Sequence, residues 1–333
     1  MSENAVDVQG LVKHFGDVKA LDGIDLTVQR GQVVGLLGPN GAGKTTTVRI
    51  LSTLLQPTSG RARVLGADVV DQAPEVRARI GLTGQYAALD DYLTGRANLI
   101  MIGRLGRLNR RQARQRADDL LARFELTGAA GRAVKTYSGG MRRRLDLAAS
   151  LIGHPEVLFL DEPTTGLDPR SRSVMWDIIR ELATGGTTLL LTTQYLDEAD
   201  QLASQIAVID AGRVIAEGSP DQLKARAGED RVALTLVPGA DLAVAAATLA
   251  AFATGPVDAE PGGLVLTAQV PDREGLTTDL IQALGASGVR VSSTTVRRPS
   301  LDDVFLTLTG HGAGSGGPAP EPVPAAQAGG SAA

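Results

Sequence analysis

A glycine-rich segment that ends in lysine and threonine has the residue types and spacing of a phosphate-binding loop. It follows the apolar run Val33–Leu37 and reads Gly38-Pro-Asn-Gly-Ala-Gly-Lys44-Thr45. The glycines let successive backbone N–H groups turn toward a phosphate, Lys44 can reach the outer phosphates, and the Thr45 hydroxyl can hold Mg²⁺. The alternative is a chance Gly-rich turn in a chain that contains 40 glycines. The segment predicts a nucleoside triphosphate site formed by Gly38, Pro39, Asn40, Gly41, Ala42, Gly43, Lys44, Thr45 and Thr46.

Two adjacent carboxylates follow a second apolar run, Val157–Leu160. The run is typical of a buried strand, and ligands of open parallel sheets collect beyond the carboxyl ends of the strands. Asp161 can therefore reach the Mg²⁺ shell, and Glu162 can polarise a water as a general base. Without the glycine-rich loop, these residues would fit an ordinary acidic turn equally well.

A second anion site is predicted at Ser138, Gly139 and Gly140. These residues precede the helical pattern Arg142–Leu151, so the new helix starts with a hydroxyl and free backbone N–H groups. One nucleotide does not need two such sites from one subunit. The basic residues just after this segment, Arg142–Arg144, fit a solvated helix face or, at most, local support of the nucleotide interface.

Together these motifs resemble the ATP-binding subunit of an ABC transporter, whose signature loop most often reads Leu-Ser-Gly-Gly-Gln. The match runs in order over roughly residues 6 to 225, and Tyr137 and Met141 depart from the common signature at its two ends. The resemblance implies further roles for three residues: Phe15 stacks on adenine, Gln85 of the Q-loop joins Thr45 and Asp161 as a metal ligand, and Asp168 belongs to the D-loop. By residue type alone, these three fit a core phenylalanine, a solvated loop glutamine and a helix N-cap before Pro169.

The family's mechanism implies two partners and a place in the cell. Two copies of the chain would pair head to tail, with Ser138, Gly139 and Gly140 of one closing over the γ-phosphate of MgATP held by Lys44 of the other. Hydrolysis would reopen the pair and transmit the motion to an integral membrane permease through the segment after Gln85. The chain is then expected to be peripheral, at the cytoplasmic face of the cell membrane.

One position departs from most of the family, which has a switch histidine where this chain has Gln194. The histidines of the chain are His14, His154 and His311, and none lies near this strand end. An amide can donate to a γ-phosphate oxygen but cannot become a cation near neutral pH. The segments Leu191–Asp200 and Lys135–Leu145 resemble the daunorubicin and doxorubicin resistance group of antibiotic exporters. This resemblance implies that Gln194 is a catalytic residue in addition to Glu162.

Composition narrows the class of protein. The 333 residues allow one large α/β domain and one small one, and the longest apolar candidate, Leu242–Phe252, is far shorter than the roughly 20 residues of a membrane span. The absence of cysteine fits a reducing cytosol, and Met1–Ala5 lack the features of a secretion signal. A net charge of −4 and 3% aromatic residues make nucleic acid an unexpected partner.

The predicted fold class is α/β, with an ABC-type P-loop ATPase domain, a small C-terminal α+β domain and a disordered tail. We assign residues 1–225 to the ATPase domain, about 86–150 to its helical signature subdomain, 229–310 to an accessory domain, and the Gly/Ala/Pro-rich 311–333 to the tail. In the accessory domain the patterns predict strands and helices at these positions: strands Val232–Val237, Leu264–Val270 and Val289–Val296, and helices Asp241–Phe252, Arg273–Leu284 and one from Ser300, capped with Asp303.

The function expected from these observations is that of an ATPase subunit that powers a separate membrane permease, most simply for export of an antibiotic or other lipophilic drug. The energy subunit of an importer, or of a polysaccharide or lipid exporter, would share every catalytic motif. A soluble ABC ATPase acting on ribosomes or DNA normally has paired ATPase domains or a long coiled-coil insertion, and this sequence contains neither.

Overall fold

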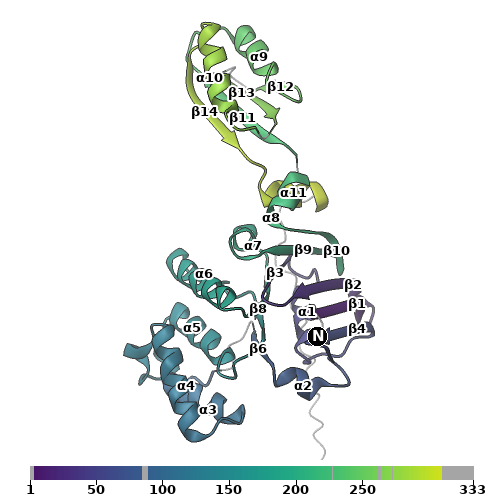
Figure 1. Ribbon diagram of the computed structural model, residues 1–333, viewed down its shortest axis with the longest axis vertical. Coiled ribbons are helices and arrows are strands. Elements are labelled where there is room, and N and C mark those ends of the chain that lie inside the picture. The colour runs from purple at the N-terminus through teal and green to yellow at the C-terminus, as the bar shows by residue number, and fades with distance from the viewer. Residues whose placement is uncertain (1–3, 85–88, 227, 261–263, 272, 310–333) are drawn as a thin grey trace, which may run out of the picture.

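The computed structural model describes residues 4–84, 89–226, 228–260, 264–271 and 273–309, with only the backbone described for 306–309. It confirms the α/β fold class with a small C-terminal α+β domain, which extends away from the larger body (Figure 1). The tail predicted at 311–333 lies outside the described residues. In the part of the chain that the structure describes, no helix is both long and apolar enough to cross a membrane.

A six-stranded, mostly parallel sheet forms the centre of the larger body. Its strand order is β10-β9-β3-β8-β7-β6, and only β10 runs antiparallel to its neighbour. The apolar runs that predicted strands are β3 and β7, in which every residue is buried because helices and a second sheet cover both faces. The strands are β3 (Val33–Leu37), β6 (Ile80–Thr83), β7 (Val157–Asp161), β8 (Thr188–Thr193), β9 (Gln205–Asp210) and β10 (Arg213–Gly218).

Strand order brings three chemically important strand ends together. In the parallel pairing, Leu37 at the end of β3 is opposite Thr193 of β8, and Asp161 at the end of β7 is opposite Thr192 of β8. Since the carboxyl ends of parallel strands meet at one edge, the loop after β3 and the acids after β7 lie on either side of the end of β8.

An antiparallel sheet packs over one face of this sheet, with strand order β2-β1-β4-β5. The helix that follows the glycine-rich loop is held between the two sheets, because its Val48, Ile50 and Leu51 belong to the same buried cluster as residues of β1, β2 and the central sheet. The elements of this layer are β1 (Asn4–Phe15), β2 (Val18–Gln29), α1 (Lys44–Leu51), β4 (Ser59–Val64), β5 (Ala67–Asp68) and α2 (Ala73–Arg77).

A helical subdomain lies beside the opposite face of the central sheet (Figure 1). Leu145 and Leu147 of its last helix share a buried cluster with Leu158 and Leu160 of β7, so this helix and β7 contribute to one core. Polar N-caps start all three helices: Thr94, Asn109 (with Gln112 as a capping box) and Ser138. The elements are α3 (Gly95–Leu105), α4 (Arg110–Arg123), the 3₁₀ turns η1 (Thr127–Ala129) and η2 (Val134–Thr136), and α5 (Gly139–Ser150).

Two further helices complete the larger body. They are α6 (Pro169–Thr184) and α7 (Leu196–Leu202). Asp168 caps α6 by accepting a hydrogen bond from the Ser171 backbone N–H at 3.0 Å, and Pro169 follows as the first helical residue. The N-cap predicted for Asp168 from residue type is therefore confirmed.

The C-terminal domain contains a four-stranded antiparallel sheet of order β12-β13-β11-β14, with two helices packed against it. All predicted strands and helices of this region are present within a few residues, and the three-residue strand β12 was not predicted. Its elements are β11 (Asp230–Leu236), α9 (Leu242–Ala250), β12 (Val257–Ala259), β13 (Val265–Val270), α10 (Leu276–Ala286) and β14 (Val291–Arg297). Two more helices, α8 (Pro220–Arg226) before this sheet and α11 (Leu301–Thr309) after it, pack on the larger body.

The last helix, α11, returns to the larger body and packs there against α7 and α8 (Figure 1). Leu301, Val304 and Phe305 share a buried cluster with Leu196 of α7 and Leu223 of α8. The predicted Ser300–Asp303 cap is confirmed, since the Asp303 carboxylate accepts from both the backbone N–H and the hydroxyl of Ser300. The chain thus crosses between the two bodies twice.

Candidate nucleotide site

The glycine-rich loop joins β3 to α1 in a conformation that glycine alone tolerates well. Gly43 has a φ of 110°, and a Cβ placed there would lie 2.7 Å from the Ala20 carbonyl oxygen. At Gly38 a Cβ would lie 2.1 Å from the carbonyl oxygen of Ile209. These close approaches allow the loop to curl over the N-terminus of α1, where backbone N–H groups favour an anion.

Lys44 lies within this curl and is only 4% exposed. Its ammonium donates to the carbonyl oxygens of Gly38 at 2.8 Å and Pro39 at 2.9 Å. Burial lowers the pKa of Lys44, and the nearby carboxylates of Glu162 and Asp161 partly offset this effect. The side chain is thus a buried cation held by groups that a phosphate oxygen can replace.

A cavity of about 290 Å³ opens above the loop. It is lined by loop residues and one acid: Asn40, Gly41, Gly43, Lys44, Thr45, Thr46 and Glu162. The structure therefore brings Glu162, which directly follows β7, to the same cavity as the predicted phosphate loop, although the two are far apart in sequence.

Asp161 is the centre of a buried hydrogen-bond network beside this cavity. One carboxylate oxygen, Oδ1, accepts from the Thr45 hydroxyl at 3.0 Å and from the Thr192 hydroxyl at 2.6 Å. A carboxylate and a hydroxyl oxygen are suitable donors for Mg²⁺, which keeps several waters and usually takes one or two carboxylates together with substrate phosphates. Thr45 and Asp161 therefore fit the predicted metal site, whereas Gln85 lies outside the described residues.

Glu162 has an unusual backbone. Its φ of 49° is in the left-handed region, and its N–H donates to both the carbonyl oxygen and the hydroxyl oxygen of Thr192, at 3.2 and 3.0 Å. Its Oε2 accepts from the Thr165 hydroxyl at 3.2 Å. Residues held in sparsely populated conformations cluster at functional sites, where the surrounding structure supports the strain.

Thr192 is a site residue that the sequence reasoning missed. It bonds both adjacent acids, through its hydroxyl to Asp161 and through its hydroxyl and carbonyl oxygens to the backbone of Glu162. The available signal was two threonines, Thr192 and Thr193, at the end of an otherwise apolar run, since polar residues at a strand end are candidates for a site.

The basic run after the signature is not a solvated face. The exposed fraction of the side chain falls from 39% for Arg142 to 20% for Arg144 and 13% for Arg143. The solvated-face reading is wrong for Arg143 above all, because α5 turns this residue toward the ends of β6 and β7, whereas the alternative of local support beside the site agrees with its position.

Other predicted site residues lie apart from the cavity. Among the residues that the structure describes, Phe15, Gln194 and Ser138–Gly140 do not contribute to its lining. Phe15 is 49% exposed at the end of β1, and the Ser138 hydroxyl accepts from the Met141 N–H as the cap of α5. Gln194, partly buried after β8, faces a small cavity with Gly38, Pro39 and Phe305.

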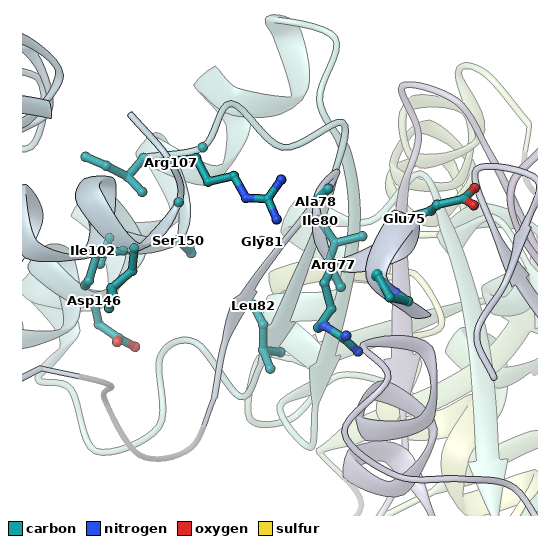
Figure 2. Close-up of a pocket in the computed structure, with 16 residues that line it drawn as sticks. Glu75, Arg77, Ala78, Ile80, Gly81, Leu82, Ile102, Arg107, Asp146 and Ser150 are labelled. Atoms are coloured by element: carbon teal, nitrogen blue, oxygen red, sulfur yellow. The ribbon is translucent and has the colours of Figure 1, made fainter. Parts of the chain in front are cut away.

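A second and larger cavity, of about 890 Å³, lies between the helical subdomain and β6, the strand at the edge of the central sheet (Figure 2). Ile80 and Leu82 of β6 line one wall, and Ile102 and Asp146 line the other. Figure 2 shows the Arg107 side chain reaching into this space from the helical wall.

Comparison with protein families gives two matches along the chain. The family model described as "ABC transporter" matches residues 21–165, and the model described as "ATP-binding protein DrrA1-3-like, C-terminal domain" matches residues 218–309. The first covers the glycine-rich loop, the signature and both acids. The second covers the C-terminal domain, including α11.

Individual relatives agree with these matches over nearly the whole length. The chain is 57% identical to the daunorubicin resistance ATP-binding protein DrrA3 of Streptomyces coeruleorubidus, over 93% of this chain and 97% of that protein. It is 40% identical to the Nod factor export ATP-binding protein I of Burkholderia lata, over 92% and 97%. Among solved structures, cbiO1 of Clostridium perfringens, part of the ABC transporter complex cbiONQ, is 28% identical with a TM-score of 0.62, over 67% of this chain and 92% of that one.

The network around Asp161 predicts the effect of Thr192→Val, which keeps the shape of the side chain and removes its hydroxyl. We expect ATP hydrolysis to fall about 10-fold, the worth of one hydrogen bond in a site, because Asp161 loses the Thr192 hydroxyl while the Glu162 N–H keeps its bond to the Thr192 carbonyl oxygen. The measurement is steady-state phosphate release. Stability is measured as the midpoint of urea unfolding, followed by the fluorescence of Trp176, the only tryptophan of the chain.

The matched control is Thr188→Val at the other end of β8, where the buried Thr188 hydroxyl accepts from the Gly31 N–H at 3.0 Å. Both variants should lose similar stability, but Thr188→Val should keep its rate of hydrolysis. Equal rates in the two variants would contradict a role for Thr192 in the site.

Proposed function

This chain belongs to the ATP-binding proteins of ABC transporters, in the group of the daunorubicin resistance ATP-binding proteins, and we propose that its ATPase activity powers a separate permease that exports an antibiotic or another lipophilic drug. The observation that carries the export proposal is 57% identity, over both domains, to a daunorubicin resistance protein. The Nod factor export protein is more distant, at 40%, which favours an antibiotic-like cargo over a Nod factor.

In this proposal the loop residues Gly38–Thr46 bind the phosphates of ATP. Lys44 exchanges its two carbonyl partners for phosphate oxygens, and half-exposed Phe15 stacks on adenine. Thr45, Asp161 and Gln85 hold Mg²⁺, which when bound neutralises negative charge on the phosphates. The proximity of Thr45 and Asp161 supports the metal assignment.

Glu162 acts as the general base. Its carboxylate accepts a proton from a water, the water oxygen forms a bond to the γ-phosphorus, and the bond from that phosphorus to the bridging oxygen of ADP breaks. Two observations support this role: Glu162 shares a cavity with Lys44, and its strained backbone is fixed by Thr192.

A second copy of the chain completes each site. Ser138 and Gly139 are exposed and stand at the N-terminus of α5, where free N–H groups favour an anion. Because they do not line the cavity of their own chain within the described residues, they are available to the nucleotide of a partner. The permease would bind the pair at the cytoplasmic face of the membrane.

The role of Glu162 predicts the behaviour of Glu162→Gln. We expect hydrolysis to fall by roughly 10² to 10⁴-fold, because an amide cannot take the proton from water, while ATP affinity stays within about 3-fold and the closed pair accumulates. Phosphate release and binding of a fluorescent ATP analogue measure the two effects.

The control is the same substitution at Glu156, Glu156→Gln. Glu156 directly precedes β7 and pairs with Arg30 and Arg79 on the surface. This variant should hydrolyse ATP at the wild-type rate. Near-normal turnover in Glu162→Gln would remove the base assignment.

For Gln194 we propose a hydrogen bond from the side-chain amide to the γ-phosphate in the closed pair. Gln194→Ala should then lose about 1 to 3 kcal/mol of transition-state stabilisation while it still binds ATP. Gln194→His should keep partial activity and gain a pH dependence between about pH 6 and 8, because imidazole titrates there and an amide does not.

The measurement is kcat as a function of pH for wild type, both variants and Gln201→Ala, a control on the exposed side of α7 that bonds Arg180. Wild-type rates in Gln194→Ala, or a pH profile that histidine leaves unchanged, would show that the γ-phosphate is sensed elsewhere.

A further inference from the structure

Arg143, in the first turns of α5, donates hydrogen bonds to four backbone carbonyl oxygens outside its own helix. Its Nε donates to Pro163 at 2.8 Å, and its Nη1 donates to Gly84 at 2.8 Å. Its Nη2 donates to Asp161 at 3.1 Å and Glu162 at 2.6 Å. One side chain thus binds every residue from Asp161 to Pro163.

These carbonyls belong to two neighbouring strand ends. Gly84 follows β6 and directly precedes Gln85, while Asp161 to Pro163 end β7 and lead into the D-loop. Buried carbonyls need partners, and where a strand ends the neighbouring strand no longer supplies them. Arg143 supplies them from the helical subdomain, so it connects three parts of the molecule at one point.

The chemistry of this contact suits arginine in particular. Guanidinium has five N–H donors in a planar fork, whereas the ammonium of lysine is a single centre that cannot reach four separated oxygens. Hydrogen bonds from a charged donor are also stronger than neutral ones. Burial lowers the pKa of Arg143, and Asp146 and Asp161 partly offset this effect, but arginine stays charged at neutral pH.

The contact is not needed to build the helix that carries it. Ser138 caps α5, and Leu145, Leu147 and Ala148 pack its apolar face against the central sheet. On its other side, Arg143 lies 3.7 Å from the carboxylate of Asp146, a residue in the wall of the larger cavity (Figure 2). Arg143 therefore stands between that cavity and the backbone of Glu162.

We propose that Arg143 is a positioning residue for hydrolysis: it fixes the backbone of Glu162 in its left-handed conformation and ties it to the strand end before Gln85. Arg143 is not among the residues that line the cavity above the loop, so it acts on the rate of the chemical step and not on ATP affinity. This inference rests on the proposed role of Glu162 as general base.

The test compares Arg143→Met, Arg143→Lys and the control Arg144→Met in the full-length chain, with kcat and KM for ATP as readouts. Arg144 is the neighbouring arginine, and its Nη1 donates to Phe124 within the helical subdomain. We expect kcat of Arg143→Met to fall about 10 to 100-fold with KM within about 3-fold, because small misplacement of a catalytic group costs this much. Arg143→Lys should recover only part of the rate, and Arg144→Met should retain wild-type kcat.

A double-mutant cycle separates this inference from the function on which it rests. If Arg143 acts through Glu162, Arg143→Met should cause little further loss in a Glu162→Gln chain. A full additional loss there, or an unchanged kcat in the single variant, would overturn the positioning role. If Glu162→Gln itself turns over normally, the base assignment fails instead. If urea unfolding shows that Arg143→Met does not fold, Arg143→Lys becomes the deciding variant. Wild-type kcat in Arg143→Lys would overturn the inference.

Discussion

The hydrogen bonds of the Asp161 carboxylate are the interaction on which the site depends. A carboxylate that is 4% exposed is costly to bury unless it is hydrogen-bonded, and Asp161 meets this demand by accepting from Thr45 and Thr192. Thr45 belongs to the helix after β3, and Thr192 belongs to β8. The strand order β3-β8-β7 is therefore the arrangement in which one acid can bond both neighbours, and it brings the phosphate loop and Glu162 to one cavity.

Residues from outside the central sheet contact the surroundings of this centre in two places. From the side of the helical subdomain, Arg143 binds the carbonyls around Glu162 and the strand end at Gly84. From the side of the C-terminal domain, α11 packs on α7, and Phe305 shares a small cavity with Gln194 and the start of the loop. Both supports are side chains from outside the central sheet. The surroundings of the nucleotide site thus contact both the helical subdomain and the helix that follows the C-terminal sheet.

Sequence reasoning was strongest where the chemistry lies in one continuous segment. Adjacent or regularly spaced residues are enough to recognise three features: the loop at Gly38–Thr46, the two acids at the end of β7, and the Ser300–Asp303 cap. Thr192 was missed because its partner is distant in sequence and its apolar run resembles a plain buried strand. The solvated-face reading failed for Arg143 because three successive arginines usually face solvent, and only the tertiary placement of α5 turns this one toward the ends of β6 and β7. The return of α11 to the larger body has no local signal, since an amphipathic helix does not specify which surface covers it. The roles of the individual site residues stay predictions, those of the loop, Asp161 and Glu162 as well as those of Gln85, Gln194 and the signature residues.

The central claim is that two copies of the chain share each ATP, with Lys44 from one and Ser138 from the other. The most direct measurement mixes Lys44→Ala and Ser138→Ala chains, each inactive alone, and follows ATP hydrolysis by isolated heterodimers that carry different affinity tags. In a shared arrangement, one of the two sites has a wild-type loop and a wild-type signature. The heterodimer should then recover up to about half of the wild-type rate per dimer, as expected for a two-fold symmetric pair. Heterodimers that form and bind ATP but release no phosphate would contradict the claim.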